Sequence, residues 1–160
     1  MIRFSKIEHN VRRLFPRLLP YFESEPAVEF AYLFGSFAEG TETPLSDVDI
    51  AVFLSPMDKS EDSSRKQDAR GRYLGIRLRI MADVSHLLHT NEVDVIILNE
   101  ADLLLRYQAV STREVLFERN PERRIDFEVE TISRYLDTQP FRRVQQEYFI
   151  QQIREGSVFG

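Results

Sequence analysis

Cysteine is absent from this chain of 160 residues, so neither a disulfide nor a thiolate metal site can form. Long apolar runs are also missing. No stretch approaches the roughly 18 residues that a membrane-spanning helix needs, and residues 1–6 lack the apolar segment of a signal peptide. From these absences we expect a cytoplasmic protein that makes no use of a membrane.

The remaining composition is that of an ordinary globular protein. Apolar residues make up 42% of the chain and charged residues 29%, and the formal net charge is −5. This length suits one domain with one sizeable core, and no repeat or linker divides the sequence. We therefore expect a single domain over residues 1–160. The acidic balance argues against direct nucleic-acid binding.

The most informative stretch is a polar, turn-rich segment between two apolar runs of strand length, 30–34 and 50–54. Asp47 and Asp49 open the second run, and side chains two apart on a strand share a face. Two such carboxylates repel each other unless a cation lies between them, and oxygen ligands together with phosphates suit Mg²⁺. Before them, Gly35 allows close approach of a ligand, and the Ser36 hydroxyl can donate to a phosphate oxygen.

A third carboxylate interrupts the next apolar run. Residues 93–99 read as a strand, and Asp94 stands near its start. A charge in a buried strand is costly unless it is paired or bound to a metal. Two interpretations stay open from the residues alone: Asp94 faces water at the edge of a sheet, or it is paired or bound to a metal.

The spacing of apolar residues and the positions of glycine and proline predict the other elements. They are a kinked helix or two short helices over 5–23, a long helix over 65–88, a short helix over 101–110, a strand over 112–118, and two C-terminal helices over about 122–137 and 141–154, divided by Pro140. His86 and His89 have a spacing that could share a metal on a helix, but no third ligand matches it, so we leave them out of the site.

The order Gly-Ser, ten residues, Asp, one residue, Asp resembles the signature of polymerase-β-like nucleotidyltransferases. Within them, residues 35–40 and 45–52 look most like the minimal nucleotidyltransferases, the antitoxin half of HEPN/MNT toxin–antitoxin pairs. The resemblance implies an α/β (α+β) nucleotidyltransferase fold. In it, a short mixed sheet is flanked by helices packed largely on one side, and C-terminal helices over about 122–154 complete the single domain.

The resemblance also implies the chemistry. Asp47, Asp49 and Asp94 would be the catalytic carboxylates and would hold Mg²⁺, two ions in all, while Gly35, Ser36 and Ser46 would bind the nucleotide. The donor would be ATP. The acceptor would be a tyrosine of a cognate HEPN ribonuclease toxin, an all-helical partner that AMP addition would neutralise. Many relatives carry arginine where Glu39 stands, and an acid there removes a possible contact to the triphosphate.

Two alternatives belong to other functional classes. One is an antitoxin that only binds its toxin, against which the three carboxylates argue. The other is a transferase for a small hydroxylated molecule such as an aminoglycoside, for which this chain is short.

Beside the polar loop at 55–64, the early part of the long helix is basic. It is either a solvated face or a docking rim for the protein acceptor, with Arg72, Tyr73 and Arg77 as candidate anchors.

Overall fold

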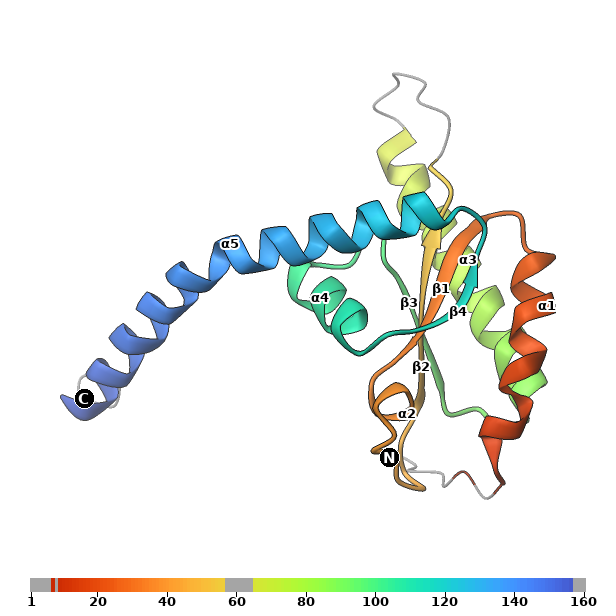
Figure 1. Cartoon of the computed structure of the whole chain (residues 1–160), viewed down its shortest axis with the longest axis horizontal. Coiled ribbons are helices and arrows are strands. Elements are labelled where there is room, and N and C mark those ends of the chain that lie inside the picture. The colour runs from red at the N-terminus through yellow and green to blue at the C-terminus, as the bar shows by residue number, and fades with distance from the viewer. Residues whose placement is uncertain (1–6, 8, 57–64, 157–160) are drawn as a thin grey trace.

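A mixed sheet of four strands, in the order β3-β2-β1-β4, lies between two layers of helices (Figure 1). The computed structural model describes residue 7, residues 9–56 and residues 65–156. The strands pair antiparallel where β1 meets β2 and β4, and parallel where β2 meets β3. The elements are the 3-10 helix η1 (Val11–Arg17), α1 (Leu18–Glu23), β1 (Val28–Phe34), α2 (Ser36–Glu39), β2 (Val48–Leu54), α3 (Arg65–Leu88), β3 (Val93–Ile97), α4 (Leu103–Thr112), β4 (Glu114–Glu118) and α5 (Pro121–Arg154).

The larger core lies on one face of the sheet. Alternate residues of β2 and β3 point into it, and η1, α1 and α3 cover it. The fully buried residues that α1 and α3 contribute are Leu18, Phe22, Ile80, Val84 and Leu88. Because the apolar spacing of α3 matches one helical face, the predicted helix over 65–88 is confirmed with the same bounds.

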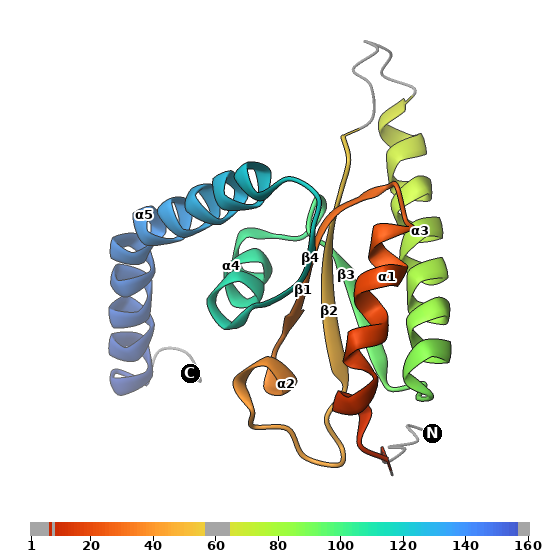
Figure 2. The same cartoon turned by 45° about the vertical axis from the view of Figure 1, so that its right-hand side comes forward.

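The opposite face carries a second, smaller core under α4 and the start of α5. Phe30 and Tyr32 of β1 pack there with Ala109 and Phe127. The rings of Phe30, Phe53 and Phe127 lie about 5 Å apart, a spacing at which aromatic pairs attract. The helices therefore cover both faces of the sheet rather than largely one (Figure 2), while the predicted α/β class and mixed sheet are confirmed.

Two predictions about helices need correction. The loop after β1 holds the short helix α2, which ends at Gly40 in the left-handed conformation that glycine favours. The C-terminal region is the single helix α5 rather than two, although Pro140 lies inside it. Proline removes one backbone donor and crowds the preceding turn, which bends a helix without having to end it, and α5 changes direction along its length (Figure 2).

The N-terminal region follows the prediction of two short helices. η1 and α1 meet between Arg17 and Leu18, and Pro16 and Pro20 lie on either side of that junction. In the described part of the chain, no helix has the length and apolar character needed to cross a membrane.

Candidate active site

Sheet register brings two of the predicted carboxylates together. Asp49 of β2 pairs with Asp94 of β3 on one side and with Phe34 of β1 on the other. Both aspartates lie on the face of the smaller core, because their neighbours along each strand point into the larger one. Asp47 immediately precedes β2. Two strands distant in sequence thus deliver three carboxylates to one end of the sheet.

The carboxylates act on one another electrostatically. Burial raises the pKa of Asp49 to about 6, and the negative charges of Asp94 and Asp47 contribute to the rise. The pKa of Asp47 is also raised, by burial, by a hydrogen bond and the charge of Glu92, and by the charge of Asp94. Glu92 was missed in the sequence because it precedes the third strand. The Val48 N–H donates to the Glu92 carbonyl oxygen at 2.8 Å and fixes it there.

These residues fit Mg²⁺ in ligand type. The charges of Asp94 and Asp47 raise the pKa of Asp49, and a cation would stabilise such a set of carboxylates. Their side chains do not yet converge: within the described residues, no three His, Cys, Asp or Glu side chains are arranged to hold a metal. Arg77 of α3 contacts one of these carboxylates. It reaches around the edge strand, donates to the Val95 carbonyl oxygen at 2.6 Å, and lies 3.5 Å from Asp94 Oδ1.

Gly35 occupies the sharp turn between β1 and α2. Its φ of +70° and ψ of −150° form a combination that only glycine adopts readily. A Cβ atom added to it would lie 2.5 Å from Asp49 Oδ2, too close for any real contact. The bare backbone of this turn therefore lies directly against the central carboxylate. The close approach of a ligand to Gly35, expected from the sequence, stays a prediction.

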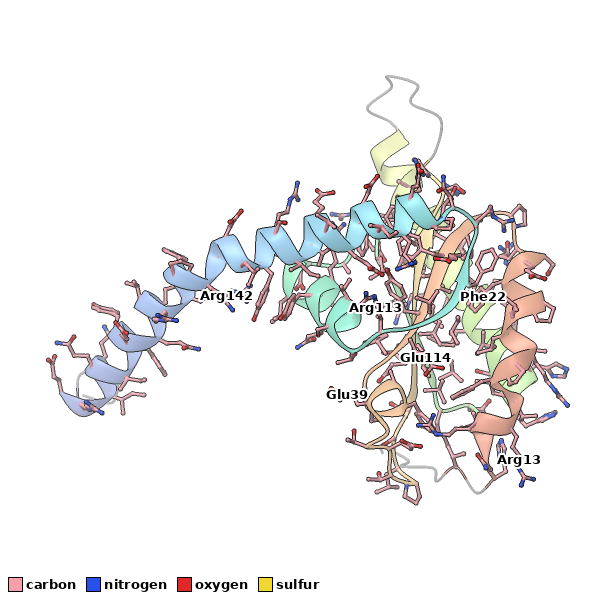
Figure 3. The ribbon with its side chains drawn as sticks, viewed as in Figure 1. Arg13, Phe22, Glu39, Arg113, Glu114 and Arg142 are labelled. Atoms are coloured by element: carbon pink, nitrogen blue, oxygen red, sulfur yellow. The ribbon has the colours of Figure 1, made fainter. Side chains whose placement is uncertain are left out.

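Thr112, the last residue of α4, holds the other side of this turn. The Gly35 N–H donates to Thr112 Oγ1 at 3.1 Å, and the same hydroxyl donates to the Gln108 carbonyl oxygen at 3.0 Å. The next residue, Arg113, donates to the buried carboxylate of Glu128 at 2.7 Å (Figure 3). The turn is thus anchored to α4 and α5. No local pattern could reveal this bond, because its two partners are 77 residues apart.

Arg12 of η1 anchors α2 and the loop that follows it. Its guanidinium donates to the Phe37 carbonyl oxygen at 2.6 Å and to Glu42 at 2.5 Å, and it lies over the Phe37 ring. The hydrogen bond from Arg12 lowers the pKa of Glu42. An ion pair and a packed ring therefore fix α2 and the first part of the loop that follows it. This role of Arg12 was also not predicted.

Comparison with known proteins agrees with this geometry. The family model described as "Polymerase beta, Nucleotidyltransferase" matches residues 17–122. The chain belongs to this nucleotidyltransferase family. No curated protein matches it in sequence.

Solved structures resemble the nucleotidyltransferase in fold. A chain of a toxin–antitoxin crystal structure with AMP-PNP is 25% identical at a TM-score of 0.60, and the match covers 89% of this chain and 99% of that one. A chain of the complex between the tri-AMPylated Shewanella oneidensis HEPN toxin and its MNT antitoxin is 21% identical at a TM-score of 0.59, with 88% and 99% covered. A chain of the toxin–antitoxin MntA–HepT is 21% identical at 0.58, with 87% and 98% covered.

The predicted nucleotide-binding serines of this nucleotidyltransferase lie in different settings. Ser36 is the first residue of α2, next to Gly35 and half-buried. Ser46 is engaged within the loop, where its hydroxyl accepts a hydrogen bond from the Thr43 N–H at 2.8 Å. Glu39 is exposed on α2 (Figure 3). Ser36 is thus the better placed of the two serines to meet a ligand, and the nucleotide role of each remains a prediction.

The candidate docking residues of α3 are largely engaged within the chain itself. Tyr73 packs against the larger core, and Arg77 lies against Asp94. Most of the neighbouring polar loop, residues 57–64, lies outside the described residues. Arg77 therefore belongs with the carboxylates rather than with a free docking rim.

His86 and His89 line a shallow surface groove of about 740 Å³ on the second half of α3. They belong to no triad of metal-ligating side chains in the described part of the chain. The groove lies on the side of α3 that faces away from the sheet, since Ile80, Val84 and Leu88 fill the inward side.

Proposed function

We propose that this nucleotidyltransferase is an MNT-type antitoxin that transfers AMP from ATP to a tyrosine hydroxyl of a cognate HEPN ribonuclease toxin. The observation that carries the proposal is the register pair Asp49 and Asp94, with Asp47 beside it, opposite the Gly35 turn. Membership of the nucleotidyltransferase family supports the reaction class. The similarity to a toxin–antitoxin structure with AMP-PNP supports the nucleotide and the partner.

The carboxylates give this site its metal chemistry. Asp47, Asp49 and Asp94 would hold Mg²⁺, which when bound supplies the positive charge that a polyphosphate substrate requires. The Arg77 guanidinium would keep Asp94 in place while the nucleotide is absent, because it offsets the charge that Asp49 and Asp47 impose. The burial of Asp49 strengthens every charge interaction at this end of the sheet.

The other residues position the substrates. The bare backbone at Gly35 leaves room for the Asp49 carboxylate beside the turn, and the Ser36 hydroxyl would donate to an oxygen of the triphosphate. In the proposed reaction the tyrosine oxygen forms a bond to the α-phosphorus, and the bond from that phosphorus to the β-bridging oxygen breaks. Pyrophosphate leaves, and Asp94, whose side chain is half-exposed, accepts the proton that the hydroxyl loses.

Radiolabel position tests this proposal. With ATP labelled at the α-phosphate, we expect the cognate toxin to become labelled and its ribonuclease activity to fall, while a toxin with its acceptor tyrosine changed to phenylalanine stays unlabelled. Label arriving from the γ-phosphate instead would identify a kinase. Loss of ribonuclease activity without any label would identify an antitoxin that acts by binding alone.

A second prediction concerns Thr112. Thr112→Val keeps the side-chain shape but leaves the Gly35 N–H without its acceptor, so we expect ATP to bind about tenfold more weakly. Thr112→Ser keeps the hydroxyl and should bind ATP as the parent does. Binding of a fluorescent ATP analogue measures the difference, and the melting temperature shows whether it comes from unfolding. If the valine and serine variants bound ATP with equal affinity, the Thr112 hydroxyl would have no role in nucleotide binding.

A further inference from the structure

Arg77 is a cation that the main chain holds beside the active-site carboxylates. It belongs to α3, which runs alongside the edge strand β3 (Figure 2). The next turn of this helix carries the fully buried Ile80, so the larger core fixes the backbone from which Arg77 extends. Arg77 Nε donates to the Val95 carbonyl oxygen at 2.6 Å. This bond involves no carboxylate, so it holds the guanidinium at β3 independently of any ion pair.

The same guanidinium faces the carboxylate set. Arg77 Nη2 lies 3.5 Å from Asp94 Oδ1. Asp94 is the register partner of Asp49, and its negative charge contributes to the raised pKa of both Asp49 and Asp47. The positive charge of Arg77 therefore lies in contact with one member of a group of interacting negative charges, the group to which we assign the metal.

A fixed positive charge has opposite effects on the two kinds of ligand that such a site meets. It repels a free divalent cation, and it holds a carboxylate oxygen that the cation needs. It attracts the complex of Mg²⁺ with ATP, since the phosphates carry more negative charge than one Mg²⁺ offsets. The side chains of Arg77 and Asp94 are 38% and 49% exposed, so solvent reduces both effects without removing them.

We propose that Arg77 is a specificity-determining residue of this site, which disfavours free Mg²⁺ and favours Mg²⁺ that arrives bound to ATP. The inference rests on the proposed function and adds to it the form in which the metal enters. Without nucleotide, Arg77 offsets part of the negative charge at Asp94, so a free ion gains less from binding. A metal–nucleotide complex brings negative charge of its own, which Arg77 then meets.

The choice of arginine fits this role. A guanidinium is planar and carries donors on several of its edges, so one group reaches the Val95 carbonyl oxygen through Nε and Asp94 through Nη2 at the same time. A lysine ammonium would keep the charge but lacks this fork. The position therefore uses two properties of arginine: the fork places the guanidinium, and the charge acts on the ligand.

Binding measurements on the full chain without toxin separate this role from a structural one. Arg77→Gln removes the charge, while its amide can still donate to the Val95 carbonyl oxygen. We expect this variant to bind free Mn²⁺, followed by electron paramagnetic resonance, about tenfold more tightly than the parent, and to bind equimolar Mg²⁺–ATP, followed by calorimetry, about fivefold more weakly. Arg77→Met should repeat this opposed pair of changes. Arg77→Lys keeps the charge and should stay within about threefold of the parent for both ligands.

Arg79→Gln is the matched control, because it removes the same charge from the same helix, but Arg79 pairs with Glu25 at 2.6 Å, outside the site. It should change neither affinity by more than about twofold. Adding Asp49→Asn to Arg77→Gln should weaken Mn²⁺ binding, which locates the bound ion at the carboxylates. A parent that binds neither Mn²⁺ nor Mg²⁺–ATP would overturn both the proposed function and this inference. If the parent binds Mg²⁺–ATP but Arg77→Gln shifts both affinities in one direction, or no further than Arg79→Gln does, the proposed function stands and the role of Arg77 is overturned.

Discussion

Replacing Asp49 by asparagine is expected to lower AMP transfer by about a hundredfold or more, because charge stabilisation of a transferring phosphoryl group contributes several kcal/mol. Asp49 is the central member of the carboxylate set: it is the register partner of Asp94, and its pKa of about 6 reflects burial and the charges of Asp94 and Asp47. Asp47→Asn should have a similar effect on transfer. The α-labelled ATP assay measures both.

The same substitution should stabilise the metal-free protein. Burial and neighbouring charge raise the pKa of Asp49 from 3.8 to about 6, so the folded state binds more protons than the unfolded state between these values, and stability falls as pH rises through them. Allowing for solvent screening, Asp49→Asn should raise the free energy of unfolding by about 1–2 kcal/mol at pH 8 and by nearly nothing at pH 4. Urea unfolding in EDTA at both pH values measures this.

Two controls separate this result from a general charge effect. Glu100→Gln removes an exposed carboxylate outside the site and should change neither transfer nor the pH dependence of stability. Mg²⁺ should stabilise the parent protein and have little effect on Asp49→Asn. A folded Asp49→Asn variant with near-parental transfer would show that Asp49 does not hold the metal.

The parts of the site that the sequence predicted are those encoded by neighbouring residues. Gly35 and Ser36 follow a strand, Asp47 and Asp49 begin another, and the alternation of side chains is enough to place them. The contacts of Thr112, Arg12 and Arg77 at the site were not predicted, because each residue reaches it from an element distant in sequence. Arg77 was named from the sequence only as a candidate docking residue. Their residue types are ordinary at such positions, so only the tertiary structure distinguishes them.

Pro140 shows a similar limit for the fold. Proline destabilises the helical turn in which it lies, and for this reason the sequence favoured two helices separated at Pro140. The cost falls on a single turn, however, and the helix continues on both sides of it. In contrast, the helix over 65–88 has no proline and a regular apolar face, so local pattern and tertiary packing agree there.

Gly35→Ala is expected to have the largest combined effect on stability and activity. The φ and ψ of Gly35 disfavour any side chain, and the new Cβ would meet Asp49 Oδ2 at 2.5 Å. Asp49 is half-buried in a strand and cannot move aside without leaving the site. We expect a loss of about 2–4 kcal/mol in the free energy of unfolding, from backbone strain and the displaced carboxylate together. Transfer should fall at least as far as it does in Asp49→Asn.

Gly40 and Gly75 provide matched controls, because a Cβ on either meets nothing within 4 Å. Gly40→Ala carries only the strain of a positive φ, about 1–2 kcal/mol, and Gly75→Ala, inside α3, should be stabilising by about 0.5–1 kcal/mol. Both should retain transfer. The contact itself is isolated by repeating Gly35→Ala in an Asp49→Ala background, where the carboxylate that it meets is gone. There the cost of the alanine should fall to that of the backbone strain alone. An unchanged cost would show that backbone strain alone, and not the approach of Gly35 to Asp49, makes glycine necessary at this turn.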